Sequence, residues 1–156
     1  CWRIFIMLSL PALLSGCSEP STLKIGFIGG TSGRVADLGV AGRNGVMLAV
    51  EERNKAGGVN GQQVELLLKD DQQDVLLAKK AAGELVAAGV SAILGPMTSS
   101  MAVEVMATTQ PSETLTMGVT VTTNQLSGKD DYFFRTLSPT LDHASETGKY
   151  LREYAR

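Results

Sequence analysis

The stretch Leu23-Lys24-Ile25-Gly26-Phe27-Ile28, followed directly by Gly29-Gly30-Thr31-Ser32-Gly33, decides the fold that we expect for this chain. A short apolar run bounded by glycines predicts a buried strand that ends in a loop. The segment 42–55 then has the spacing of an amphipathic helix, and Gly57 and Gly58 suit its end. A strand, a loop and a helix in this order predict the start of a βαβ unit.

The same alternation continues to the end of the chain. Further strands are expected at 63–69, 90–94, 114–119 and 132–136. Asp74 is the expected N-cap of a helix that stops at Gly89, and a third helix starts at Thr98 or Ser99 and runs to about Thr109. A last helix follows the fifth strand. Alternating strands and helices predict right-handed crossovers and an α/β fold, a doubly wound parallel sheet with helices on both faces.

Hydroxyl side chains gather in the loops that follow the expected strands. In a doubly wound sheet, ligands bind beyond the carboxyl ends of the strands, where the strand order reverses. Ser99 and Ser100 also open a helix, whose free N–H groups favour an anion such as a carboxylate. Single Ser and Thr residues are common caps and turn formers, so the prediction rests on their convergence at one edge. We expect Asp70 and Asp71 to hold loop backbone rather than to touch ligand.

Composition argues against several classes of function. Fourteen basic and sixteen acidic residues give a net charge of -2 and are scattered, which excludes the basic patch of a nucleic-acid-binding protein. His143 is the only histidine, so neither a His-based triad nor a His-rich metal site is available. We therefore expect no enzyme activity, no metal and no cofactor.

A NAD-dependent oxidoreductase is the enzymatic alternative, because four glycines lie in or after the first strand: Gly26, Gly29, Gly30 and Gly33. A dinucleotide site needs the helix to open at the last glycine and an acidic residue at a strand end about 20 residues further on. Here the first helix is expected only near Gly42, and no acid occupies that place. The local pattern therefore disfavours this alternative.

The N-terminus has the pattern of an export signal. Arg3 precedes an apolar run, Ile4 to Leu14, that is too short for a bilayer-spanning helix of about 20 residues. The sequence Leu14-Ser15-Gly16-Cys17 resembles the lipobox of bacterial lipoproteins, which implies a signal peptide over 1–16, a lipid on Cys17 and a tether over 17–23. An ordinary buried helix is the alternative. With the lipid we expect a membrane-anchored protein of the periplasm or cell surface, without a disulfide.

Residues 24–135 resemble the extracellular ligand-binding receptors of branched-chain amino acid and amide ABC transporters, which have the type I periplasmic binding protein fold. The matching motifs are Ile25-Gly26, Thr31-Ser32-Gly33, Gly45 with Leu48-Ala49, Asn54 through Gly61, Lys69-Asp70-Asp71, Gly95-Pro96 and Phe134-Arg135-Thr136. The resemblance implies two lobes that hold ligand between them, with the N-terminal lobe over 24–138 and the start of a truncated second lobe over 139–156. Since residue 1 is not Met and the helical pattern at 149–156 lacks a cap, we interpret the chain as the N-terminal piece of a longer protein, truncated at both ends.

The same resemblance implies roles for individual residues. Ser99 would receive the ligand carboxylate, the Thr120 carbonyl and the Thr122 hydroxyl would hold its amine, and Leu38 would border its side chain. Ser100 and Ser32 are further candidates. Some relatives join the loops near Gln73 and Thr98 by a cysteine pair, which is absent here, and leucine-type binders often have an aromatic at the position of Leu38.

These observations predict a solute-binding lipoprotein that captures an amino acid or amide-like molecule and delivers it to an ABC transporter permease. The alternative within the same fold is a ligand-sensing domain of a signalling receptor. An acidic residue of the second lobe, outside this chain, is expected to complete the site.

Overall fold

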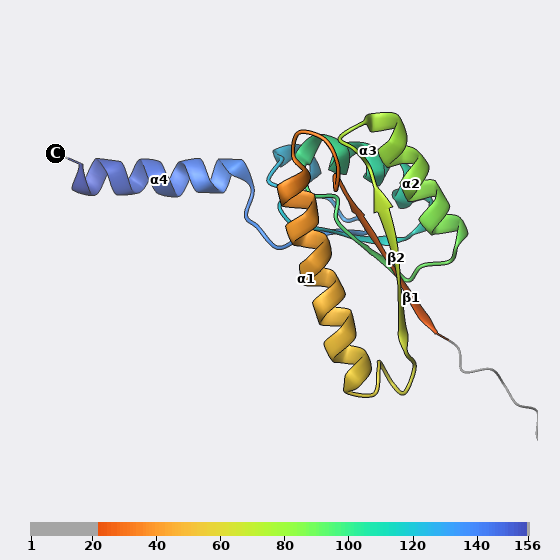
Figure 1. The fold of residues 1–156 in the computed structure, drawn as a ribbon. Coiled ribbons are helices and arrows are strands. Elements are labelled where there is room, and N and C mark those ends of the chain that lie inside the picture. The colour runs from red at the N-terminus through yellow and green to blue at the C-terminus, as the bar shows by residue number, and fades with distance from the viewer. Residues whose placement is uncertain (1–21, 156) are drawn as a thin grey trace, which may run out of the picture.

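The computed structural model describes residues 22–155, which form one five-stranded parallel sheet flanked by helices (Figure 1). The strand order is β2-β1-β3-β4-β5, so the order reverses between β1 and β3. The strands are β1 (Leu23–Gly29), β2 (Val64–Asp70), β3 (Ala92–Leu94), β4 (Leu115–Gly118) and β5 (Phe133–Arg135). This arrangement confirms the predicted α/β fold with a doubly wound parallel sheet.

The helices lie on both faces of the sheet. Helix α1 covers one face, α2 and α3 cover the other, and α4 extends away from the body of the lobe (Figure 1). Their bounds are α1 Ala36–Lys55, α2 Val75–Ala87, α3 Ser99–Thr109 and α4 Thr140–Tyr154, with 3₁₀ turns η1 at Gln110–Ser112 and η2 at Asn124–Leu126. Within residues 22–155 none of the helices is both long enough and apolar enough to span a membrane.

The face beneath α2 and α3 holds the core. Ile28 of β1 and Ile93 of β3 are fully buried against Leu85 of α2 and Val105 of α3. A second cluster continues this core toward β5 and contains Ala102, Met106, Val121, Leu126 and Phe133. Because side chains of a strand alternate between faces, the intervening residues point to the α1 side.

The α1 face is only partly covered. Phe27, Leu94, Met117 and Phe134 lie side by side in register across four neighbouring strands. Phe27, beneath α1, is 0% exposed, Leu94 and Met117 are half-buried, and Phe134 is 53% exposed. The apolar row therefore becomes more open from β1 toward β5.

Helix α1 begins at Ala36 rather than near Gly42, so the predicted start was wrong. Gly39 and Gly42 lie inside the helix, and their lack of a side chain lets the helix approach the neighbouring loops. A Cβ on Gly39 would lie 2.0 Å from the Gly30 carbonyl oxygen. The late helix start therefore no longer counts against a dinucleotide site. The second objection stands, since the position about 20 residues after Gly33 lies inside α1 and not at a strand end.

Other helix ends agree with the predicted signals. The Asp74 carboxylate accepts the N–H groups of Leu76 and Leu77 at 2.8 and 2.9 Å, which caps α2 as expected. Gly89 has φ of +72° after the end of this helix. Thr98 is the N-cap of α3, but its hydroxyl makes no cap hydrogen bond.

The outer edge of β2 is closed at its first residue by a side chain of α1. The Asn54 amide donates to the Val64 carbonyl at 2.8 Å and accepts the Val64 N–H at 2.7 Å. The preceding residue, Gln63, accepts the N–H of Leu23 from β1. Successive residues of a strand direct their backbone N–H and C=O groups to opposite sides. The backbone groups of Val64 therefore point away from β1, toward the free edge of the sheet.

Leu23 belongs to β1, so the tether expected over 17–23 overlaps the sheet by one strand residue. The predicted signal peptide at 1–16 and the lipidation of Cys17 lie outside the described residues.

Candidate functional site

Two hydroxyl-bearing loops meet beyond the carboxyl ends of β3 and β4. The Ser99 hydroxyl oxygen accepts the N–H of Thr122 at 3.3 Å, and the Thr120 hydroxyl donates to the Met97 carbonyl. Three of the residues that the sequence singled out, Ser99, Thr120 and Thr122, are thereby brought together. They lie next to the reversal of strand order, as the sheet rule requires.

The start of α3 is suited to an anion. Ser99 is the first residue of the helix, and no side chain caps the helix within the described residues. Its first N–H groups therefore carry unsatisfied partial positive charge. The Ser99 oxygen accepts a hydrogen bond from Thr122, and a hydroxyl that accepts can still donate its own proton to a ligand. This corner offers a hydroxyl and backbone amides to a carboxylate.

Asp70 holds the loop after β1. Its carboxylate accepts the Thr31 N–H at 2.8 Å, the Ser32 hydroxyl at 2.7 Å and the Gln72 N–H at 3.0 Å. Partial burial opposes ionisation, but these hydrogen bonds outweigh it and lower the pKa of Asp70. The structure confirms that Asp70 holds loop backbone, and it shows that the Ser32 hydroxyl already has an acceptor within the protein.

Asp71 holds the next turn from inside. It is 0% exposed, and its Oδ1 atom accepts the Gln73 N–H at 2.9 Å and the Gln73 side-chain amide at 3.2 Å. Burial raises the pKa of Asp71, the hydrogen bonds from Gln73 oppose this, and the nearby charge of Asp70 adds to it. Its Oδ2 atom has no hydrogen-bond partner among the described residues. Asp71 thus also has the predicted role of holding backbone.

Gln73 connects this turn to the start of α3. The Thr98 hydroxyl donates to the Gln73 side-chain oxygen at 3.0 Å. These are the two loops that a cysteine pair joins in some relatives of the resembled family. A neutral hydrogen bond occupies that place here and holds the loop that carries Ser99.

The remaining predicted site residues are less tightly connected. Leu38, 39% exposed, lies near the start of α1, and Ser100 is exposed on the first turn of α3. The Ser100 side chain makes no hydrogen bond to Ser99, Thr120 or Thr122, and the apolar side chain of Leu38 can make none. Both residues belong to helices that begin at the carboxyl edge of the sheet. The structure relates them to the other three residues in this respect alone.

Sequence reasoning missed two residues that hold the same loop. The Thr122 carbonyl accepts both the N–H of Thr140 at 2.8 Å and its hydroxyl at 3.0 Å. The Asn124 side chain accepts the N–H of Leu141 at 3.2 Å. Their available signal was local only: Thr140 follows Pro139 at a helix start, and Asn124 ends a threonine-rich loop.

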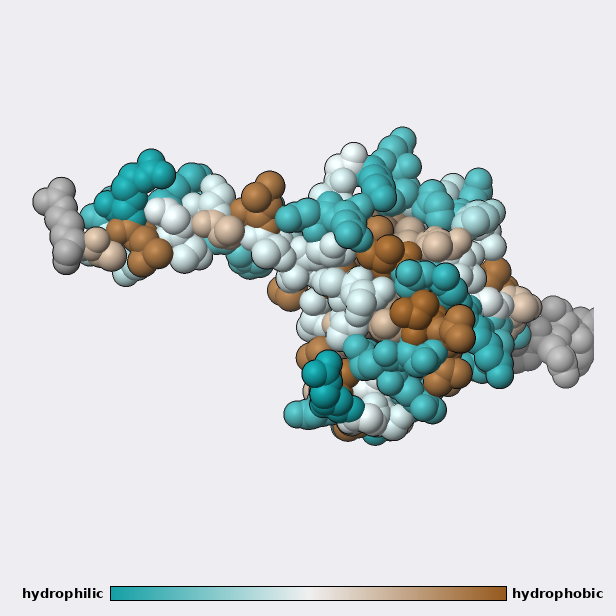
Figure 2. All heavy atoms as spheres, turned by 90° about the horizontal axis from the view of Figure 1, so that it is seen from above, coloured by the Kyte–Doolittle hydropathy of each residue, from teal (hydrophilic) through white to brown (hydrophobic). Residues whose placement is uncertain are grey.

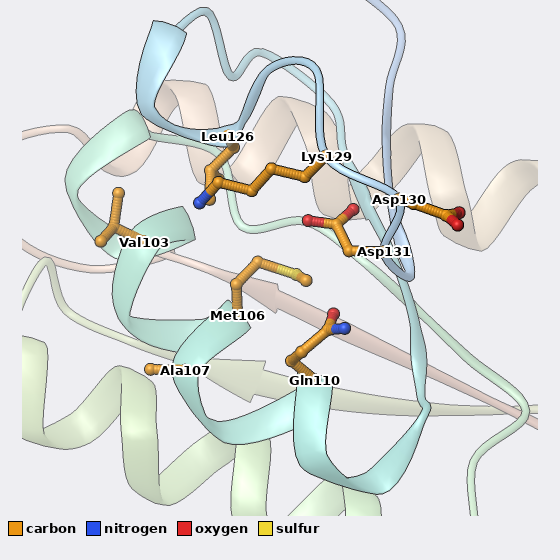
Figure 3. Close-up of a pocket in the computed structure, with 8 residues that line it drawn as sticks. All are labelled: Val103, Met106, Ala107, Gln110, Leu126, Lys129, Asp130 and Asp131. Carbon is orange, nitrogen blue, oxygen red and sulfur yellow. The ribbon is translucent and has the colours of Figure 1, made fainter.

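A separate hollow of about 440 Å³ lies between α3 and the segment from η2 to β5 (Figure 3). Its lining combines apolar and charged side chains and includes none of the predicted site residues: Val103, Met106, Ala107, Gln110, Leu126, Lys129, Asp130 and Asp131. Asp131 is half-buried, and its side chain accepts the Phe133 N–H at 3.0 Å, so it supports the loop before β5. Elsewhere, His143, the only histidine of the sequence, is exposed on α4.

Residues 22–155 contain no group of three or more side chains of His, Cys, Asp or Glu that could hold a metal ion. A parallel sheet with hydroxyl-bearing loops converging beyond its carboxyl edge is suited to an α/β lobe that binds a small ligand. Residues 22–155 match the family model described as periplasmic binding protein. The chain belongs to this family.

Similar proteins agree with this assignment. A leucine-, isoleucine-, valine-, threonine- and alanine-binding protein of Pseudomonas aeruginosa is 37% identical over 98 residues, which are 63% of this chain and 26% of the relative. The branched-chain amino acid transporter substrate-binding protein of Streptococcus pneumoniae, solved with isoleucine, has a TM-score of 0.78 and 31% identity over 86% of this chain and 39% of that chain.

An ABC transporter substrate-binding protein of Desulfitobacterium hafniense, solved with leucine, shares the fold with a TM-score of 0.76 at 23% identity, over 85% of this chain and 39% of that one. The chain thus spans between a quarter and two fifths of the length of these relatives. Their names describe binding proteins rather than enzymes.

Proposed function

We propose that this chain is the N-terminal lobe of an extracytoplasmic binding protein that captures an amino acid or amide-like solute for an ABC transporter permease. The observation that carries the proposal is the Ser99–Thr122 hydrogen bond, which joins the anion-favouring start of α3 to the threonine loop after β4. Family membership and the amino-acid ligands named for the Pseudomonas and Streptococcus relatives support the same substrate class.

In this proposal the two loops after β3 and β4, which we call the rim, bind the two charged ends of a zwitterion. The Ser99 hydroxyl and backbone N–H receive the carboxylate, while the Thr120 carbonyl and the Thr122 hydroxyl receive the amine. Leu38 borders the ligand side chain. Ser100 and Ser32 are secondary contacts, and Ser32 would have to share its hydroxyl with Asp70.

One lobe supplies too little free energy for tight binding. Hydrogen bonds to charged groups contribute roughly 1.5–3 kcal/mol each, whereas micromolar affinity corresponds to about −8.2 kcal/mol. Two or three contacts from this rim must also offset the loss of ligand freedom. A second lobe beginning near residue 139 would supply the remaining contacts, and closure of the two lobes around ligand is the state a permease would recognise.

The proposal includes export and anchoring. A signal peptide over 1–16 would direct secretion, and a lipid on Cys17 would hold the protein at the membrane surface, with residues 24–138 as the first lobe. Labelling with a radioactive fatty acid tests the anchor, with Cys17→Ser as the control that should lose the label.

Calorimetric titration of the full-length protein with L-isoleucine and L-leucine tests the site. Ser99→Ala removes one hydrogen bond to a charged group and should weaken binding at least about tenfold. Ser91→Ala makes the same chemical change at an exposed position before β3 and should leave affinity unchanged. Wild-type affinity in Ser99→Ala would contradict the assigned site, whereas a full-length protein that binds no amino acid would contradict the substrate class.

A further inference from the structure

The N-terminus of α4 is capped by a different segment of the chain. The first N–H groups of a helix have no partner within the helix, and Pro139, at the N-cap, offers no side-chain hydrogen bond. The Thr122 carbonyl accepts the Thr140 N–H at 2.8 Å, and the Asn124 side chain accepts the Leu141 N–H at 3.2 Å. Two of the unsatisfied groups are thus satisfied by the loop after β4.

That loop, residues 119–127, is held at several other points by the last residue of β5 and by the crossover from β5 to α4. The Arg135 guanidinium donates to the Thr123 carbonyl at 2.8 Å and also to the Ser127 hydroxyl. The Thr136 hydroxyl donates to the Val119 carbonyl. The loop that carries Thr120 and Thr122 and the segment that leads out of the lobe therefore form one hydrogen-bonded unit.

Thr122 lies where this unit meets the candidate site. Its N–H donates to the Ser99 hydroxyl, while its carbonyl accepts from Thr140. A change in the position of Thr122 would therefore alter both the rim and the start of α4.

Among the described residues, no buried side chain of α4 helps the cap to set the direction of this helix. None of the residues of α4 is buried, and the helix stands clear of the body of the lobe in both views (Figures 1 and 2). Asn124 is not needed to cap its own 3₁₀ turn, because the Thr123 hydroxyl accepts the Gln125 N–H there. Its side chain is thus available for α4 alone.

We propose that Asn124 is a positioning residue for ligand binding: by capping α4 in concert with the Thr122 carbonyl, it fixes the direction in which the chain leaves this lobe. Through that direction it sets where the next lobe presents its part of the ligand site. This inference rests on the proposed function, because it assigns Asn124 no contact with ligand.

Three substitutions in the full-length protein test the role. Asn124→Ala removes the acceptor for the Leu141 N–H. Asn124→Asp keeps an acceptor and places a negative charge at a helix N-terminus, where it is favourable. Gln125→Ala alters the exposed neighbouring side chain and serves as the control.

Two measurements separate the cap from its consequence. Hydrogen exchange of the 140–146 amides without ligand should accelerate about fivefold in Asn124→Ala, which is the typical effect of losing one N-cap. The dissociation constant for L-isoleucine should rise by a similar factor of about five in the same variant. Asn124→Asp and Gln125→Ala should stay within about twofold of wild type in both measurements.

Three outcomes would overturn the inference: unchanged exchange in Asn124→Ala, faster exchange with unchanged affinity, or an Asn124→Asp variant that behaves like Asn124→Ala. Absence of amino-acid binding by the wild-type protein would instead count against the proposed function. In that case the exchange measurement still decides whether Asn124 caps α4, and spin-label distances from the first lobe to α4 decide whether the cap sets its direction.

Discussion

The two faces of the sheet are built from the same strands but differ in what covers them. On the α2/α3 face, Ile28 and Ile93 are completely buried, whereas on the α1 face the row from Phe27 to Phe134 is buried at one end and open at the other. Both faces carry large apolar side chains. Hydrophobicity therefore identifies the strands, while the position of the helices decides which of those side chains contribute to the stability of this lobe.

The largest expected effect distinguishes a core residue from a residue of the open face. Leu85→Ala removes a fully buried side chain that packs against the sheet, and it should lower the free energy of unfolding by about 3 kcal/mol. Phe134→Ala removes a half-exposed ring and should cost about 1 kcal/mol or less. Urea denaturation of both variants measures the difference. Equal costs would mean that the open face is covered in the protein in solution.

A smaller effect concerns the contact of α1 with the sheet. Gly39→Ala places a Cβ within 2.0 Å of the Gly30 carbonyl, so the helix must shift, at a cost of about 1–3 kcal/mol. Gly45 lies in the same helix, where an added Cβ would meet nothing within 4 Å, and Gly45→Ala should stabilise by up to about 1 kcal/mol through helix propensity. Thermal unfolding compares the two. Similar shifts in both would show that α1 does not approach the loop closely.

The third prediction concerns two adjacent carboxylates, at the last residue of β2 and at the residue that follows it. Asp70 binds the loop before α1, and its pKa is lowered, whereas Asp71 is buried toward Gln73 and its pKa is raised. The stabilisation from Asp70 is present above its unfolded pKa, near 3.8, and is lost as pH falls through the lowered value. For Asp71 the sign is opposite: stability is highest below 3.8 and falls as pH rises through the raised value.

Denaturation of Asp70→Asn and Asp71→Asn from about pH 3 to about pH 7 measures these slopes. Relative to wild type, Asp70→Asn should become progressively less stable as pH rises, and Asp71→Asn progressively more stable. Parallel profiles for the two variants would contradict the opposite environments of the carboxylates.

Much of the fold could be predicted from the sequence, because its signals are local. Asp74 and Gly89 mark the ends of α2 by capping and by positive φ, and both were identified correctly. The start of α1 could not be placed, because Gly39 and Gly42 normally weaken a helix and are explained only by contacts with Gly30 and Met97. The contact between Gly42 and Met97 joins residues that are distant in sequence, and the contact between Gly39 and Gly30 depends on how the loop after β1 folds back on the helix.

The candidate site shows the same division. Ser99 was predicted from its loop at a helix start and Thr122 from the family resemblance, and the structure joins them through one hydrogen bond. Asn124 and Thr140 were missed because their importance depends on where α4 begins relative to the loop after β4. A side chain that caps a helix from a separate segment leaves no spacing pattern along the chain.

The contact between Asn54 and Val64 has a consequence for solubility. An outer strand with unpaired N–H and C=O groups is a template on which strands of other molecules can add. The Asn54 amide occupies both outward groups of Val64, and so it closes the first position of β2 to such addition. A single carboxamide thereby takes, at this one position, the place that the backbone of an added strand would occupy.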